Sequence, residues 1–168
     1  LNAVETAGNN LKEAGHKIDR VKIPDWISKT EEETLDTILA FGMAHHHGKD
    51  YDMNKPLMSE RICDYIERGR QLTEQDYQAA MDQRQAMIRE MTEIIDKKVA
   101  LMPPAIGIAP LLEEGTGPRS PQRLWTLLGF PAMTVPFGTS QSMPIGVQVV
   151  SSLFQDYNVL SVVRKLFN

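Results

Sequence analysis

The sequence predicts an α/β protein in which α-helices cover a mixed β-sheet. Two runs rich in β-branched residues, 132–137 and 145–150, are typical of strands. The polar linker 138–144 between them contains glycine and proline, so the two strands are predicted to form a hairpin. Over several other segments, apolar residues recur every three or four positions, which predicts helices packed on that sheet.

The chain opens with a predicted helix. Val4, Ala7, Leu11 and Ala14 stand at helical spacing, and Gly15 is the type of residue expected just past a helix end. The following residues, 17–23, predict a short strand that ends at Pro24.

The second predicted helix begins at Thr30. Thr30 and Glu33 have the spacing of a capping box, and an apolar stripe then extends to about Ala44. Residues 50–56 are expected to form a loop.

Three adjacent histidines, His45, His46 and His47, raise the question of a metal site. Successive residues on a helix point about 100° apart, so all three side chains cannot face one ion. We therefore favour a solvated helix end over a metal centre.

Two further helices are predicted in the middle of the chain. Ser59 is placed to cap a helix that ends at Gly69, and Thr73 is placed to cap a long helix over 74–96. Cys63 lies on the first of these helices with no histidine or aspartate partner nearby in sequence, which favours a buried thiol over a nucleophile.

A strand, an irregular segment and a helix end precede the hairpin. Residues 99–102 predict a short apolar strand, and proline and glycine make 103–110 irregular. The loop 113–122 is not followed by the Gly-Lys-Ser or Gly-Lys-Thr of a phosphate-binding loop. The apolar run 124–128 then closes a helix at Gly129.

Alternation along the hairpin assigns its side chains to two faces. In the second strand, Ile145, Val147 and Val149 share one face, whereas Gly146, Gln148 and Val150 share the other. Pro136 cannot donate to a ladder, so its strand is expected at an edge or to be irregular there.

The last predicted helix is capped by Ser152 with Gln155, or else by Asp156. Its apolar stripe is predicted to consist of Tyr157, Leu160, Val163 and Phe167.

Composition limits the class of protein. A chain of 168 residues suits one domain, and its net charge of −4 argues against a general nucleic-acid or anionic-membrane surface. One cysteine fits a reducing compartment, so a cytoplasmic location is expected. No apolar run approaches the roughly 20 residues of a membrane span.

The residues LLGFPAMTVPFG followed by MPIGVQVV resemble the C-terminal signature of the amidase signature family. The resemblance implies an α/β hydrolase that cleaves carboxamides with a Ser–cis-Ser–Lys triad. It also implies that residues 1–168 are the C-terminal portion of a single domain of the amidase signature fold.

The resemblance implies that the loop 113–122 and the helix after it line the substrate pocket. The candidate substrate-binding residues are Arg119, Gln122, Arg123, Trp125 and Thr126. An arginine here would favour a substrate with a carboxylate, through a bidentate contact. The other interpretation is that Trp125 belongs to the core and that both arginines are solvated.

The residues of the family's triad are not recognisable in the sequence. It has neither a GSSGG-like run nor a GxSxG motif, and each serine has a local interpretation as a cap or loop residue. We therefore assign no catalytic residue, metal or cofactor, expect the triad to precede Leu1, and expect the chain alone to be inactive.

The expected partners are those of an incomplete amidase. They are a small-molecule amide substrate in the complete enzyme and a missing N-terminal half or partner subunit; the chain could also form a homo-oligomer. A non-catalytic binding or assembly subunit derived from the same fold stays open as an alternative, as does a chance match of an unrelated protein.

Overall fold

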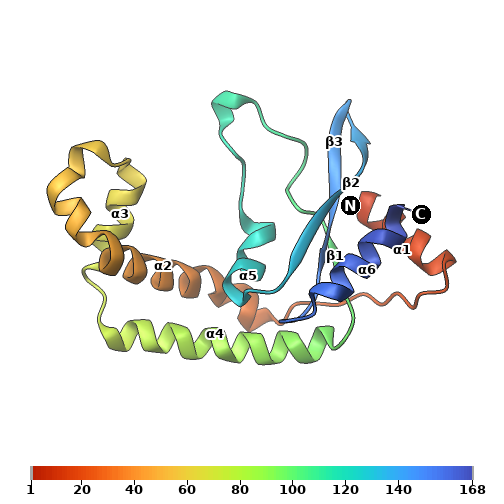
Figure 1. Cartoon of the computed structure of the whole chain (residues 1–168), viewed down its shortest axis with the longest axis horizontal. Helices are drawn as coiled ribbons and strands as arrows, with labels where there is room; N and C mark the ends of the chain where they lie inside the picture. The colour runs from red at the N-terminus through yellow and green to blue at the C-terminus, as the bar shows by residue number, and fades with distance from the viewer. Residues whose placement is uncertain (1, 168) are drawn as a thin grey trace. The chain divides into compact units, whose positions relative to one another are not determined.

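The computed structural model describes the backbone of residues 2–167 and the side chains of residues 3–166 (Figure 1). The chain divides into two compact units. Residues 24–88 form a helical unit, and residues 2–23 together with 89–167 form a unit built on a sheet.

The sheet unit contains three antiparallel strands in the order β1-β3-β2. They are β1, Ala100–Met102, β2, Ala132–Ser140, and β3, Met143–Val150. The register pairs Leu101 with Val149 and Val135 with Val147. The predicted hairpin and the predicted short strand before the proline-rich segment are confirmed, and Pro136 lies on the edge strand β2.

The hairpin turn is shorter than the predicted linker 138–144. Pairing continues to Ser140 and Met143, so only Gln141 and Ser142 form the turn, and both have positive φ angles of 49° and 64°. A register shift between Pro136 and Thr139 includes Gly138 at φ 107°. The prediction was wrong because polar side chains can point to solvent while their backbone groups still pair across the ladder.

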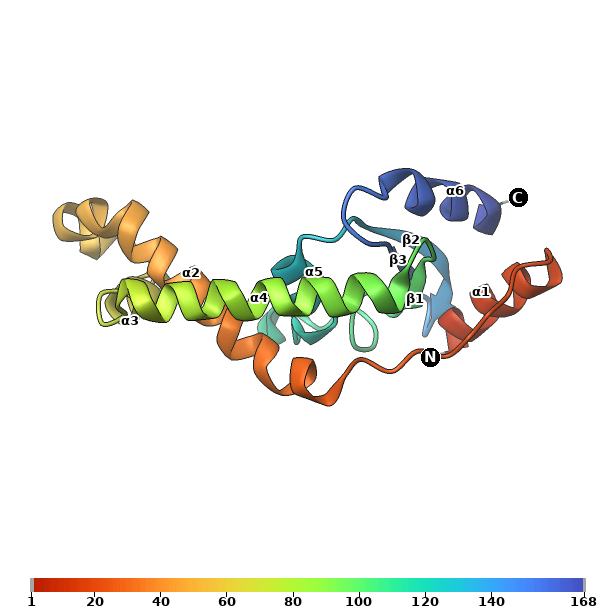
Figure 2. The ribbon, with the colours of Figure 1, turned by 90° about the horizontal axis from the view of Figure 1, so that it is seen from below.

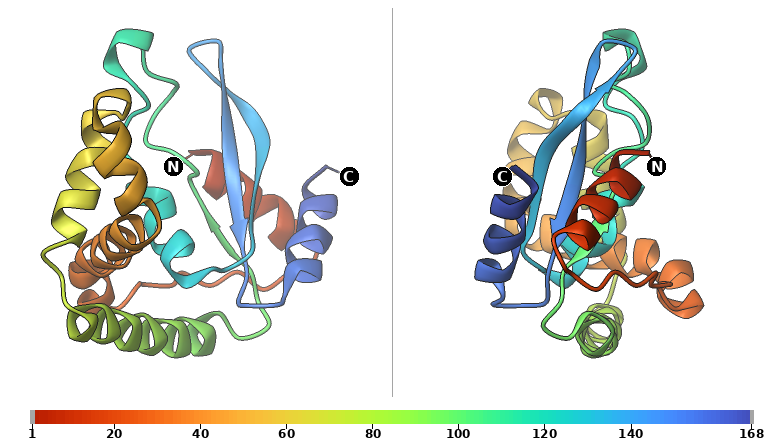
Figure 3. Two further views of the ribbon diagram at one scale, coloured as in Figure 1. Left: turned by 60° about the vertical axis from the view of Figure 1, so that its left-hand side comes forward. Right: turned by 90° about the vertical axis from the view of Figure 1, so that its right-hand side faces the viewer.

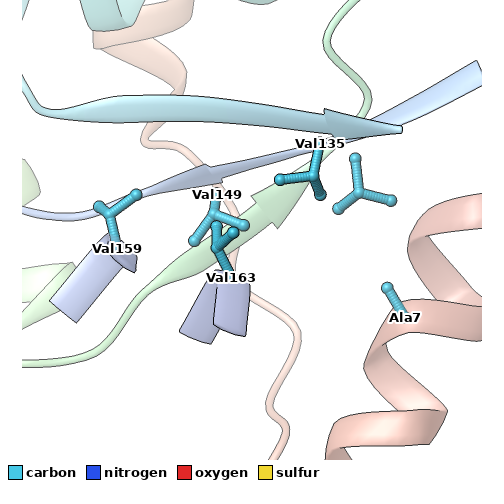
Figure 4. Packing of buried hydrophobic residues seen from close by; sticks show 6 residues of the cluster. Ala7, Val135, Val149, Val159 and Val163 are labelled. Carbon is cyan, nitrogen blue, oxygen red and sulfur yellow. The ribbon is translucent and has the colours of Figure 1, made fainter. Parts of the chain in front are cut away.

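The face of the sheet that carries Val147 and Val149 packs against two helices. These are α1, Asn2–Glu13, and α6, Asp156–Phe167, which flank the hairpin in Figure 3. Ala7 of α1 and Val163 of α6 meet the strand valines in one buried cluster (Figure 4). The predicted assignment of Val147 and Val149 to one shared face is confirmed, and Gln148 lies on the opposite face.

The predicted stripe of α6 is confirmed at Val163 and wrong at Tyr157 and Leu160. Tyr157 is 86% exposed and Leu160 is 49% exposed, whereas Val159 and Val163 are buried in the cluster. The predicted residues and the buried valines of α6 both recur at helical spacing. The sheet face, which carries valines itself, packs against Val159 and Val163. The side chain of Phe167 lies outside the described residues.

The predicted strand over 17–23 is also absent. Residues 16–24 form an irregular segment after α1, and Ile18 and Val21 are 44% and 61% exposed. A strand requires a ladder partner, and none of the three described strands pairs with this segment.

The helical unit begins with one long helix, α2, Asp25–Asn54, followed by the 3₁₀ turn η1, Lys55–Leu57. The predicted start at Thr30 is wrong: Thr30 lies inside the helix, where its hydroxyl donates to the Trp26 carbonyl at 2.8 Å. Pro24 immediately precedes the helix, and no proline interrupts it before Pro56.

Because α2 continues to Asn54, two other predictions fail. Most of residues 50–56 is helical rather than a loop, and His45, His46 and His47 lie within the helix rather than at its end. All three imidazoles are exposed to some degree, as a solvated position requires.

Helix α3, Glu60–Gly69, packs against α2 (Figure 2). Ile66 and Cys63 are buried with Tyr51 in a small cluster, which confirms the buried thiol. Ser59 holds the N-cap position of α3 but makes no side-chain capping hydrogen bond. Helix α4, Glu74–Ile95, follows as predicted and begins next to Thr73.

Candidate functional site

The site is built around α5, Ser120–Leu128, which is short but firmly anchored. Leu124, Leu127 and Leu128 are buried, and Gly129 ends the helix in the left-handed conformation at φ 71°, as predicted. The amides of Gly129 and Phe130 both donate to the Trp125 carbonyl, at 2.9 and 3.2 Å. This turn fixes the position of the Phe130 ring relative to Trp125, with 6.2 Å between the ring centroids.

A pocket of about 310 Å³ lies where α5 meets the beginning of β2 and the middle of β3. Its volume is at the lower end of the range for small-molecule sites. No lining residue carries an ionisable side chain, and the lining combines two aromatic rings with three polar, uncharged groups. The lining residues are Gln122, Trp125, Thr126, Gly129, Phe130, Ala132 and Gln148.

Three of the five predicted substrate-binding residues come together in this lining: Gln122, Trp125 and Thr126. Trp125 is only 5% exposed, so it belongs to the core and also forms a pocket wall. Arg119 holds the N-cap position of α5 and is exposed, whereas Arg123 is half-buried on the helix. Neither arginine is part of the lining.

Gln122 also has a structural contact. Its side-chain amide donates to the Pro104 carbonyl, which connects α5 to the irregular segment after β1. The Pro104 ring approaches β3 as well, because a Cβ atom on Gly146 would lie 3.4 Å from Pro104 Cγ and 2.9 Å from the Val135 carbonyl oxygen. Glycine at position 146 therefore lets this segment and β2 lie close to the face that carries Gln148.

Sequence reasoning missed four lining residues: Gly129, Phe130, Ala132 and Gln148. Gln148 is the most informative of them. It is 6% exposed, and its Oε1 has no hydrogen-bond partner among the described residues. The signal was a single amide side chain in the otherwise apolar run Ile145–Val150, on the face opposite Val149.

The helical unit holds a second, larger cavity of about 520 Å³ beside η1 and α3. Lys55 and Glu67 are in its lining and form an ion pair at 2.8 Å, and the Tyr51 hydroxyl donates to the same carboxylate. The hydrogen bond with Glu67 raises the pKa of the Lys55 amine, and the bond from Lys55 lowers the pKa of Glu67. Because these groups satisfy one another, this cavity is the weaker candidate for a ligand site.

Two serines of the sheet unit, Ser151 and Ser152, are buried. The Ser151 hydroxyl donates to the Lys98 carbonyl at 2.9 Å, which ties the end of β3 to the residues before β1. This hydroxyl therefore has a structural role, although its partner is far away in the sequence and the role expected from the sequence was a local one. Among the side chains of residues 3–166 there is no cluster of three histidine, cysteine or carboxylate groups that could hold a metal.

The described helices also include none whose length and apolar character would suit a membrane span.

The sequence matches a protein-family model described as Amidase over residues 1–160. It is 45% identical over 40 residues to a glutamyl-tRNA(Gln) amidotransferase subunit from Thermotoga maritima, a stretch that covers 24% of this chain and 8% of that protein.

Two solved structures show the same fold. A crystal structure of an amidase aligns with a TM-score of 0.83 at 23% identity over 99% of this chain. A bacterial aryl acylamidase of the amidase signature enzymes aligns with a TM-score of 0.76 at 14% identity over 98% of this chain. The chain spans 41% and 39% of the lengths of these two proteins.

Proposed function

Because this chain belongs to the amidase family, we propose that it is the C-terminal portion of an amidase-type hydrolase that cleaves carboxamide C–N bonds. Residues 1–168 would then be part of a single domain of the amidase signature fold. The observation that carries the proposal is the family match over residues 1–160, in a chain that spans about two fifths of solved structures with the same fold.

Within such an enzyme, this chain supplies the hydrophobic core of one region and a wall of the substrate pocket. Amide hydrolysis needs an activated nucleophile, a base and donors for the oxyanion. In the proposal, these groups come from the part of the enzyme that precedes these residues. The hydrogen bond of the buried Ser151 to the Lys98 carbonyl supports this division, since it gives that hydroxyl a structural role.

The substrate-binding segment in this proposal is α5 with the residue before it. Gln122, Trp125 and Thr126 line the pocket and contact the part of the substrate that enters it. Arg119 and Arg123 lie on the same segment outside the lining, so they act on a substrate that extends beyond the pocket. There, a guanidinium would favour a carboxylate or another group rich in acceptors.

The proposal also includes a partner segment that covers the sheet unit. Several large apolar side chains there are exposed, among them Leu111 at 68%, Leu112 at 93% and Phe154 at 89%. Exposed apolar groups of this kind favour association. The N-terminal half of the enzyme or a separate subunit is the proposed cover, and a second copy of this chain is a further candidate. A cytoplasmic location stays a prediction based on the single cysteine.

The test compares the complete protein that contains this chain with the chain alone on a panel of small carboxamides. We expect the complete protein to release ammonia or an amine, and residues 1–168 alone to match the uncatalysed rate. A folded complete protein that cleaves no carboxamide would contradict the proposed activity. Turnover by residues 1–168 alone would place the nucleophile within this chain.

A further inference from the structure

Gln148 is a buried polar residue whose side-chain carbonyl has no partner among the residues that the structure describes. The residue is 6% exposed, and no described group donates to its Oε1. An unpaired buried carbonyl destabilises the folded state, because the hydrogen bonds that it made with water are not replaced. An apolar residue at position 148 would avoid this loss, so the presence of glutamine calls for a function.

The surroundings of Gln148 supply that function. Gln148 lines the same pocket as Trp125 and Phe130. The two rings offer flat apolar surface, and the other polar side chains in the lining, those of Gln122 and Thr126, are uncharged. A pocket with this lining suits a flat, uncharged group and disfavours a charged one, which would lose its hydration without gaining an ion pair.

We infer that Gln148 is a substrate-binding residue, and that its side-chain oxygen accepts a hydrogen bond from an uncharged hydroxyl or N–H group on a flat apolar group held against Trp125 and Phe130. This inference rests on the proposed function, because it takes the pocket to be the place where the substrate binds. The oxygen of a glutamine amide accepts a hydrogen bond without carrying a charge, so it can pair with a neutral donor.

The inference predicts that binding and stability change in different directions in one variant. Gln148→Met keeps an unbranched side chain of similar length but removes the amide. The melting temperature of the complete protein should stay the same or rise, because the unpaired carbonyl is gone. Ligand affinity should fall, because the hydrogen bond to the ligand is lost. A residue that only supported the fold would not separate these two quantities.

The experiment measures binding to the complete protein by titration calorimetry with two probes. Benzyl alcohol has an aromatic ring and a hydroxyl donor but no C–N bond to cleave, and benzoate has a similar shape with a negative charge. Wild-type protein should bind benzyl alcohol more tightly than benzoate. Gln148→Met should weaken benzyl alcohol binding about fivefold, the value of one neutral hydrogen bond. Gln141→Met is the matched control, because Gln141 is exposed in the hairpin turn and lies outside the pocket lining.

Two results would overturn the inference. They are wild-type protein that does not bind benzyl alcohol, and equal benzyl alcohol affinity in wild type and Gln148→Met. If the affinity is equal and the melting temperature of the variant is lower, the amide pairs with another part of the protein. Since neither probe is hydrolysed, these outcomes are independent of amide turnover. A protein that binds benzyl alcohol through Gln148 and cleaves no carboxamide would reject the proposed function alone.

Discussion

Gly69 of α3 and Ala40 of α2 are so close that a Cβ atom on residue 69 would lie 1.9 Å from the Ala40 carbonyl oxygen and 2.8 Å from the Ala44 Cβ. The atoms that it would meet belong to the helix backbone and to a short side chain, so they cannot move aside separately. Glycine at this position therefore sets how closely α3 packs on α2.

Gly69→Ala should lower the stability of the complete protein by about 3 kcal/mol, at the upper end of the overpacking range. The measurement is the urea midpoint of unfolding. Gly42→Ala is the matched control, because a Cβ atom added to this glycine of α2 would meet no atom of another segment within 4 Å. That control should gain up to about 1 kcal/mol from helix propensity. Equal midpoints for the two variants would contradict the close packing.

The start of α4 predicts a dependence of stability on pH. The Thr73 amide and hydroxyl both donate to the Asp76 carboxylate, at 2.8 and 2.7 Å, and these bonds lower the pKa of Asp76 from its ordinary value of 3.8. A carboxyl whose folded-state pKa is lowered stabilises the protein above its unfolded-state pKa and loses that effect as pH falls through the folded-state value. Asp76→Asn should therefore lower the melting temperature at pH 7.

The difference in melting temperature between wild type and Asp76→Asn should disappear below the lowered pKa of Asp76, because wild-type Asp76 is itself protonated there. Thermal melts of both proteins between pH 7 and the acid limit of folding measure it. Glu74→Gln is the control, because this exposed carboxyl of the same helical turn lacks the bonds from Thr73. A constant gap between wild type and Asp76→Asn across this range would show that the capping interaction does not depend on the carboxylate.

The hairpin turn is a place where the sequence can be improved. Gln141 and Ser142 have positive φ angles of 49° and 64°, a conformation that favours asparagine followed by glycine in a two-residue turn. Changing Gln141→Asn together with Ser142→Gly should raise stability by about 1 kcal/mol. Gln141→Val should lower it, because β-branched residues resist positive φ. Urea unfolding of the three proteins checks the order, and a less stable Asn-Gly variant would contradict the turn.

Arg119 should affect substrate charge preference rather than the pocket itself. In the complete enzyme, Arg119→Ala should lower kcat/KM for an anionic amide about fivefold relative to a neutral amide of similar size, as expected for an exposed ion pair. Arg123→Ala should shift the same ratio in the same direction. Arg20→Ala is the control, because Arg20 is exposed and already paired with Glu5 at 3.5 Å. An unchanged ratio in both variants would mean that the arginines do not contact the substrate.

Local sequence determined many of the elements. The apolar periodicity predicted α1, α3 and α4, and glycines 15 and 129 marked where the chain leaves a helix. The β-branched composition predicted β2 and β3, and alternation along β3 placed Gln148 on the face that does not carry Val149. These features depend on backbone preferences and on side-chain periods of a few residues, so a single segment contains the information for them.

Other features depended on partners far away in the sequence. The capping box at Thr30 predicted the start of α2, but the helix begins earlier, at Asp25. Contacts with α3 then hold its C-terminal part, including the bond from the Arg70 guanidinium to the Gly48 carbonyl at 2.9 Å. Residues 17–23 have strand composition but no ladder partner among the described strands, so they stay irregular.

The sequence by itself determined the family, the order of most elements and a set of candidate residues on α5, because those follow from a contiguous motif. Only the tertiary structure decided which of them share a pocket. It joined Gln122, Trp125 and Thr126 to Phe130 and Gln148, and it left Arg119 and Arg123 outside. The physical reason is that residues from different elements form a pocket. Gln148 is buried without a partner among the described residues because of the side chains that α5, β2 and β3 place around it.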